Sequence, residues 1–142
     1  MYNKFGIHIK VLNFNKSYRF YKNLGFKECF AYGSKEFIKS LNKSIPTAKE
    51  KYNGVVFNLG NSLFEIADGH IAVKSKVFKE KIQSSKVSAM IHINSLKRIV
   101  NTCKKNKIKI AVPERIFPWG TKEVVIKDPD GFVLVFIEKL KQ

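Results

Sequence analysis

Two histidines and one glutamate carry the chemistry that this sequence offers. His8 lies in the stretch FGIHIKVL, His92 lies in VSAMIHINS, and Glu65 lies in the apolar stretch SLFEIAD. A carboxylate among apolar residues needs a partner, which could be Lys10, His8 or a cation on a ligand. An imidazole near it could bind a metal ion, act as an acid or base, or line a pocket. These residues therefore decide whether the protein is an enzyme or a binder.

The spacing of apolar residues predicts the elements that position these side chains. Apolar and polar residues alternate over 5–12, which is typical of a half-buried strand, and NFNKSYRFYKNLGF has helical spacing that ends at Gly25. A second strand, FKECFAYG, is followed by a polar stretch over 34–53, for which we expect an extended connection with one helical turn. The stretch GVVFNLGNSLFEIADG then predicts a β-hairpin with its turn at GN.

The same order of elements recurs in the second half of the chain. VSAMIHINS predicts a strand, LKRIVNTCKKNKIKI an amphipathic helix, and the remainder three strands, two of them joined by the turn DPDG. The repeat predicts an α+β fold of two βαβββ modules, 1–69 and 88–142, joined by a helical linker over 70–87 within a single domain, 1–142. We expect two concave, antiparallel-rich mixed sheets that face a shared cleft, each with its helix on the convex side.

Three motifs within this repeat resemble one known family. They are SYRFYKNLGF at 17–26, the pair Trp119 and Gly120, and DPDG at 128–131. In this order they are similar to the vicinal oxygen chelate superfamily, which includes glyoxalase I, extradiol dioxygenases, fosfomycin-modifying thiol transferases and bleomycin-resistance proteins. The pattern is closest to the bleomycin-resistance-like members. The resemblance implies the glyoxalase/bleomycin resistance fold over nearly the whole chain, and a homodimer.

The resemblance also identifies where metal ligands would lie. Metal-dependent members hold a divalent ion with two histidines and one or two glutamates from the first and last strands of each module. The matching positions here are Gly6, Glu65, Ser88 and Val135, and of these only Glu65 has a strong donor side chain. We therefore predict no metal and no cofactor, and interpret His8 as a pocket wall paired with Glu65. A displaced site made by His8, Glu65 and His92 stays open as the alternative.

The predicted function is binding of a small molecule in the concave cleft. The resemblance implies aromatic side chains along the groove, and we expect Trp119 to stack on a planar ligand and Phe57 to reach the cleft. His8, Lys10, Glu65 and His92 complete the predicted ligand-binding set. The alternative is a metal-dependent lyase, dioxygenase or thiol transferase that uses the displaced site, so enzymatic activity stays undecided.

Charge and composition bear on the partners. The formal charge is +16, which points away from cationic bleomycin and toward a neutral or anionic aromatic or thiol-type ligand. The cations are 24 lysines and three arginines scattered along the chain, whereas nucleic-acid sites favour arginines or a concentrated stripe, so we expect no nucleic-acid partner.

No apolar run is long enough to cross a membrane and the N-terminus lacks a signal-peptide pattern, so we expect a cytoplasmic protein. The two cysteines, Cys29 and Cys103, are expected to be buried free thiols.

Overall fold

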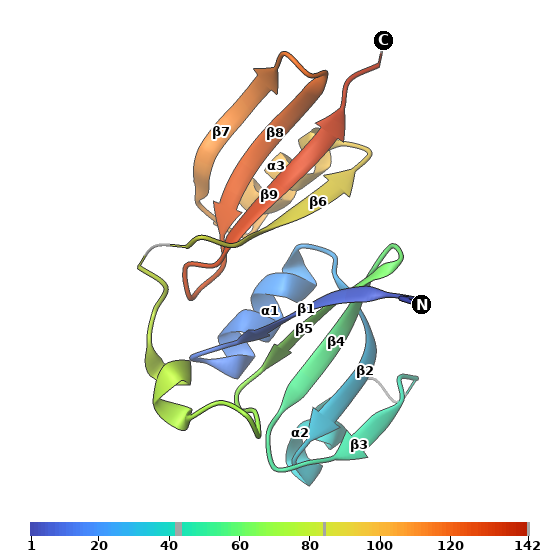
Figure 1. The fold of residues 1–142 in the computed structure, drawn as a ribbon, viewed down its shortest axis with the longest axis vertical. Helices are drawn as coiled ribbons and strands as arrows, with labels where there is room; N and C mark the ends of the chain where they lie inside the picture. Colours follow the sequence, from blue (N-terminus) through green and yellow to red (C-terminus); the bar gives the residue numbers. More distant parts are fainter. Residues whose placement is uncertain (42–43, 84, 142) are drawn as a thin grey trace. The chain divides into compact units, whose positions relative to one another are not determined.

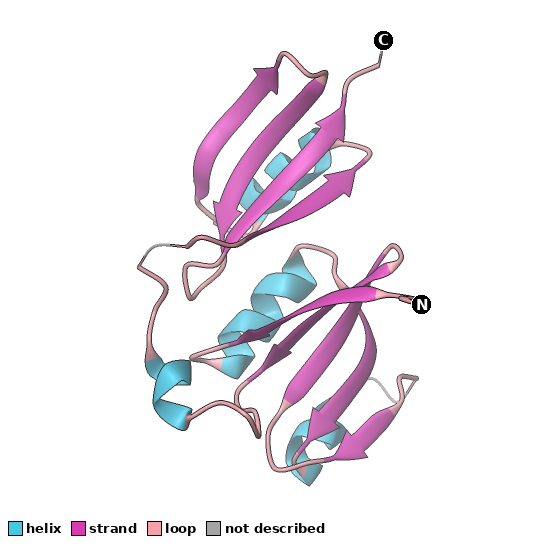
Figure 2. Cartoon of the chain, viewed as in Figure 1, coloured by secondary structure: helices cyan, strands magenta, loops and turns pink. Residues whose placement is uncertain are grey.

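The chain forms two compact units, Met1–Glu80 and Lys81–Gln142, each built around its own sheet (Figure 1). The computed structural model describes residues 1–41, 44–83 and 85–141. The second unit has the predicted order of a strand, a helix and three strands, and the first unit has this order with one short helix and one short strand added (Figure 2). The α+β architecture of two mixed sheets, each covered by a helix, is confirmed.

The first unit holds a five-stranded sheet in the order β1-β5-β4-β2-β3. Its elements are β1 (Phe5–Lys10), α1 (Phe14–Asn23), β2 (Lys27–Gly33), α2 (Lys35–Ser40), β3 (Thr47–Lys49), β4 (Gly54–Leu59) and β5 (Ser62–Ala67). Asn13 caps α1 by accepting a hydrogen bond from the Lys16 backbone N–H at 3.1 Å, and Gly25, with a φ of 89°, follows its end.

One face of this sheet packs on α1 and forms the first core. Tyr21 of α1 is fully buried, with its ring centroid 4.9 Å from that of Phe64 and 6.1 Å from that of Phe57. β1 runs parallel to β5, and His8 lies directly beside Glu65 in that pairing. Because neighbouring residues on a strand face opposite sides, His8 and Glu65 point to the sheet face away from α1.

The second unit holds a four-stranded sheet in the order β6-β9-β8-β7. Its elements are β6 (Ser88–Ile93), α3 (Leu96–Lys105), β7 (Ile110–Phe117), β8 (Thr121–Lys127) and β9 (Val133–Lys139). The apolar side of α3 supplies Leu96, Ile99 and Cys103 to a core that includes Leu134 and Phe136 of β9.

The turn DPDG is built on a carboxylate. The Asp128 Oδ1 accepts hydrogen bonds from the backbone N–H groups of Asp130, at 2.9 Å, and Phe132, at 2.8 Å. Gly131 has a φ of 94°, and a Cβ there would lie 2.8 Å from the Ile82 carbonyl oxygen. The turn predicted between two strands is therefore confirmed.

Two connecting segments differ from the prediction. The segment over 34–53 contains a short helix and a strand, α2 and β3, although residues 42–43 within it lie outside the described residues. The predicted surface helix over 70–87 is wrong, because residues 70–83 and 85–87, which the structure describes, contain only a five-residue 3-10 helix, η1 (Ser75–Lys79). Lys74 supplies no side-chain cap, and lysines at 76 and 79 place like charges one turn apart, which destabilises an α-helix. Among the described residues, no helix is long and apolar enough to cross a membrane.

Both cysteines are free thiols, as expected. Cys103 is buried in the second core, whereas Cys29 of β2 is only half-buried.

Candidate functional site

A pocket of about 450 Å³ lies on the face of the first sheet that points away from α1. Its polar lining includes His8, Glu65 and His70, and its aromatic walls are Phe30, Tyr32 and Tyr52. Lys49 and Glu50 of the β3 segment, with Ile71 beyond β5, complete one side. The site therefore combines two carboxylates, two imidazoles and one lysine with three aromatic rings, a composition that suits a small organic ligand.

Glu65 is held by a tyrosine. The Tyr32 hydroxyl donates to the Glu65 Oε1 at 2.6 Å, within the range of a strong, charge-assisted hydrogen bond. Burial, followed by the hydrogen bond and the negative charge of Glu65, raises the pKa of Tyr32, so its hydroxyl keeps its proton. This contact fixes the carboxylate in one orientation at the pocket wall.

His8 is a neutral imidazole despite its acidic neighbour. Its Nε2 lies 3.8 Å from the Glu65 Oε1, which is beyond hydrogen-bonding distance. Burial lowers the pKa of His8. The positive charges of Lys10 and of a protonated His70 lower it further. The negative charge of Glu65 raises it, but by less than burial lowers it. Among the described residues no group hydrogen-bonds to this Nε2, and the atom is shielded from solvent. A ligand could therefore contact this Nε2 only after a neighbouring side chain moves.

His70 is the second imidazole of the site. Its ring meets the His8 ring edge-on, with the centroids 5.1 Å apart, and its Nδ1 accepts a hydrogen bond from the Ala72 backbone N–H at 3.0 Å. That bond fixes the tautomer, because Nδ1 must be unprotonated to accept, so a neutral His70 carries its proton on Nε2.

Two glycines make room for the aromatic walls. A Cβ on Gly54 would overlap the Tyr32 ring, and a Cβ on Gly69 would overlap the Tyr52 ring. Gly54 is the partner of Tyr32 in the pairing of β2 with β4. The Tyr32 ring lies over Gly54, and its hydroxyl contacts Glu65. The Tyr32–Glu65 contact thus depends on the absence of a side chain at residue 54.

The structure brings together only part of the predicted ligand-binding set. His8 and Glu65 are neighbours, and the Lys10 Nζ lies beside them, donating to the His8 carbonyl oxygen at 3.4 Å. The expectation that Phe57 reaches the cleft is wrong, because Phe57 pairs with Phe64 and is fully buried on the α1 face. Val56 and Phe57 are neighbours on β4, so their side chains point to opposite faces of the sheet. Val56 pairs with Glu65 and shares its face, and Phe57 therefore points to the other face.

His92 and Trp119 belong to the second unit. His92 is an exposed residue of β6, and Trp119 follows β7 with 66% of its surface exposed. The Trp119 ring stacks on Phe117 with the centroids 4.7 Å apart, and the Arg115 guanidinium lies 5.0 Å from the Phe117 ring centroid. Trp119 is thus an accessible aromatic surface rather than a buried packing anchor.

Sequence reasoning missed His70, Tyr52 and Phe30 as site residues. Phe30 and Tyr32 are two residues apart on β2, so strand alternation places both on the face of Glu65 once the register is known. His70 and Tyr52 lie outside the strands, and no periodic pattern marks them.

The residues present do not fit the metal centre that the fold family implies. Gly6 of β1 and Val135 of β9 have no donor atom, and the hydroxyl of Ser88 is a poor ligand. Across the part of the chain that the structure describes, no three His, Cys, Asp or Glu side chains are grouped so that they could hold a metal ion. His8 and Glu65 alone would give a weak, two-residue site.

With this geometry established, the chain can be compared with known proteins. A model of the Glyoxalase/Bleomycin resistance protein/Dioxygenase superfamily matches residues 7–136. The chain belongs to this superfamily. No curated protein matches the chain.

Solved structures of the superfamily share the fold at low sequence identity. A superfamily member from Sphaerobacter thermophilus is 18% identical, with 98% of each chain covered and a TM-score of 0.65. A point mutant of the fosfomycin resistance protein FosX from Listeria monocytogenes, complexed with Mn(II) and 1S,2S-dihydroxypropylphosphonic acid, is 18% identical, with 92% of this chain and 87% of that chain covered and a TM-score of 0.62. A bleomycin resistance determinant encoded on the transposon Tn5 is 16% identical, with 94% and 95% covered and a TM-score of 0.58. The same fold is thus found in a fosfomycin resistance protein complexed with Mn(II) and in a bleomycin resistance determinant.

Proposed function

We propose that this chain binds a small aromatic molecule, neutral or anionic, in the pocket of the first unit, without a metal ion. The observation that carries the proposal is the cluster in which Tyr32 holds the Glu65 carboxylate beside a neutral His8 with an unpartnered Nε2. The cluster lies among three aromatic rings. The likeness of the fold to the bleomycin resistance determinant encoded on Tn5 supports a binding role by analogy.

Each part of the pocket has a role in this proposal. The aromatic rings provide contact area for a planar ligand, and the two fixed polar groups orient it. A ligand hydroxyl that donates to Glu65 would give the carboxylate a second hydrogen bond beside the one from Tyr32. Lys49 lines the pocket together with Glu50 and Glu65, so the lining does not by itself set the sign of the ligand's charge. The neutral or anionic character of the ligand is inferred from the formal charge of +16 on the chain. The ligand-binding roles expected for Trp119 and His92 stay predictions.

Metal content is the first test of this proposal. We expect purified protein to contain no stoichiometric metal by elemental analysis, and Ni²⁺, Mn²⁺ and Zn²⁺ to leave its melting temperature unchanged. Stoichiometric metal that is lost in His8→Ala or Glu65→Ala would overturn the metal-free proposal. It would favour the second candidate, a metal-dependent lyase, dioxygenase or thiol transferase, which is supported by the likeness to FosX with Mn(II).

Ligand binding is the second test, and Tyr32→Phe is its sharpest variant. A panel of small aromatic acids, phenols and thiols is screened by thermal shift, and the dissociation constant of any hit is measured by calorimetry. We expect Tyr32→Phe to weaken binding about ten-fold, because Glu65 loses the hydrogen bond that orients it.

Tyr18→Phe is the matched control for that variant. The Tyr18 hydroxyl donates to the Glu28 Oε1 at 2.8 Å, so this change removes a similar tyrosine–glutamate bond elsewhere in the same unit. We expect it to leave ligand affinity unchanged. Equal losses in the two variants would indicate a general effect on folding and would count against the pocket.

We also propose that two copies of the chain associate. The second sheet presents an apolar row in register across all four strands, formed by Met90, Val135, Val125 and Val112. Met90 is 71% exposed and Val112 47% exposed. Exposed apolar side chains that gather in this way are typical of interaction surfaces.

A further inference from the structure

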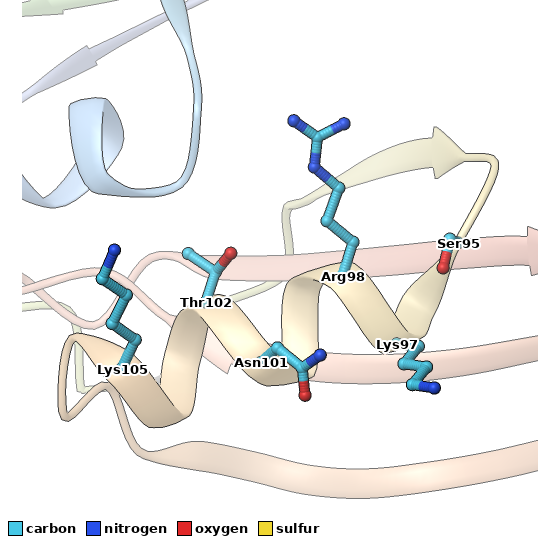
Figure 3. A pocket seen from close by; sticks show the side chains of 6 residues that line it. All are labelled: Ser95, Lys97, Arg98, Asn101, Thr102 and Lys105. Atoms are coloured by element: carbon cyan, nitrogen blue, oxygen red, sulfur yellow. The ribbon is translucent and has the colours of Figure 1, made fainter.

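The outward face of α3 carries four cations. Lys97, Arg98, Lys104 and Lys105 are all exposed there, whereas the opposite side of the helix lies in the core. A hollow of about 390 Å³ on this helix is lined by Ser95, Lys97, Arg98, Asn101, Thr102 and Lys105 (Figure 3). We call these residues, with Lys104, the α3 face.

No acidic residue nearby in the sequence balances these charges. Residues 81–113 contain eight lysines and arginines and no aspartate or glutamate. The five acidic residues of the second unit have other contacts or lie in the DPDG turn. Glu114 pairs with Lys122, and Glu123 accepts a hydrogen bond from Thr121. Asp128 and Asp130 lie in the turn, and Glu138 contacts Lys122 and the Leu96 backbone N–H. Glu138 is the one that meets α3, and it does so through the backbone. The α3 face therefore keeps its positive charge.

The start of α3 departs from what helix stability alone would favour. Lys97 and Arg98 lie in the first turn, at the positive end of the helix dipole, and that turn contains no acidic residue. Ser95 is at the N-cap, yet its side chain makes no capping hydrogen bond. Cations in the last turn, such as Lys104 and Lys105, stabilise a helix, but those in the first turn do not. Helix stability therefore does not account for the first-turn pair, a feature that α1 shares through Lys16 in its own first turn.

The side chains on this face are those that contact phosphates. Lysine and arginine, together with serine, threonine and asparagine, make most protein contacts to the nucleic-acid backbone. The pairs at 97/98 and 104/105 are seven residues apart, which is about 10 Å along a helix. Duplex DNA carries its phosphates closely enough that side chains spread over this length can contact more than one of them.

Other polyanions fit the α3 face less well. The apolar side of α3 is occupied by the core, so the helix has no apolar face to place in a lipid bilayer. The helix has no aromatic residue on which unpaired bases could stack. Although lysines are scattered along the whole sequence, four of the cations lie within α3 and on its exposed side, which forms the concentrated patch that a nucleic-acid partner needs.

We propose that the α3 face is a docking surface for the phosphate backbone of duplex DNA, independent of base sequence. The proposal goes beyond ligand binding in the first unit and does not depend on it. Since the contacts are to phosphates, affinity must fall steeply with salt.

Binding is measured by fluorescence anisotropy on a labelled duplex of about 20 base pairs, at roughly 50 to 200 mM salt. The test variant is Lys97→Gln/Arg98→Gln/Lys105→Gln. The matched control is Lys16→Gln/Arg19→Gln/Lys27→Gln, which removes the same two lysines and one arginine from exposed positions of the first unit. Circular dichroism checks that both variants keep the native fold.

We expect the wild-type protein to bind the duplex with a dissociation constant of about 10⁻⁶ to 10⁻⁴ M at physiological salt. The α3 variant should bind about ten-fold or more weakly, and the slope of log affinity against log salt should fall by about 2 to 3, since each lost phosphate contact removes about 0.9. The control should keep most of the affinity and slope.

Three results would overturn the proposal. The first is wild-type binding weaker than about 10⁻⁴ M. The second is an equal loss of duplex affinity in the control variant, which would show that only the net charge of the protein matters. The third is tighter binding to a single strand of the same sequence, or to vesicles of equal parts phosphatidylserine and phosphatidylcholine, than to the duplex.

Discussion

His8 shows how burial can outweigh an attractive charge. A carboxylate 3.8 Å from an imidazole normally favours the protonated ring, yet the pKa of His8 is lowered because desolvation is the larger effect. The pair is thus a neutral imidazole beside a carboxylate that Tyr32 holds, rather than an ion pair. Such a pair can accept and donate hydrogen bonds to an uncharged ligand.

The lowered pKa of His8 predicts a loss of stability in acid. Unfolded His8 takes up a proton as the pH falls through about 6.5, while folded His8 resists protonation until a lower pH. The unfolded state therefore binds more protons in that window, and the free energy of unfolding falls with it. We expect His8→Gln to reduce this fall, measured by urea unfolding at about pH 7.5 and about pH 5.5. Tyr18→Phe, which changes no imidazole, should keep the wild-type difference, and an unaltered difference in His8→Gln would contradict the prediction.

At the scale of elements, the pairing of β2 with β4 makes Gly54 a requirement of the pocket. We expect Gly54→Ala to lower the free energy of unfolding by about 1 to 3 kcal/mol, because its Cβ overlaps the Tyr32 ring and the ring must move. The Tyr32–Glu65 hydrogen bond should be lost with it. Chemical denaturation measures the first effect, and ligand affinity the second.

A double-mutant cycle separates this overlap from a general effect of alanine on β4. In a Tyr32→Ala background the ring is absent, so Gly54→Ala should cost much less than it does alone. Additive costs would show that the Tyr32 ring is not what the substitution disturbs.

The turn between β8 and β9 depends on one side chain. Asp128→Ala removes the acceptor of two backbone N–H groups, at Asp130 and Phe132, and should destabilise the protein by about 1 to 3 kcal/mol. Asp128→Asn keeps an Oδ1 that can accept both bonds and should cost less. Urea midpoints of the two variants test this, and equal costs would contradict it.

Sequence patterns predicted the elements better than their contacts. Alternation and helical spacing identify β1, α1, β6 and α3, since each buries one face in a core. They do not fix strand register, and register decides that Glu65 faces the pocket while Phe57 faces α1. The site is therefore predicted at His8 and Glu65 but not at His70, whose position depends on the path of a loop.

At the scale of the whole molecule, we expect a homodimer. Sedimentation equilibrium should give a mass twice the 16.3 kDa of the chain. Met90→Glu/Val112→Glu should shift the protein to monomer by placing charges in the exposed apolar row of the second sheet. Val77→Glu, at an exposed position of the first unit, should not. A wild-type monomer at every concentration would contradict this expectation.

Both sheets pair the first strand of a module with its last. His8 of β1 lies beside Glu65 of β5, and Ile91 of β6 lies beside Phe136 of β9. A ribosome makes these strands from the N-terminus onward, so β1 and β6 each emerge long before the strand that completes their hydrogen bonds. Until then, each nascent module exposes an open edge to neighbouring chains. The speed of translation through the second half of each module is thus expected to influence the yield of native protein.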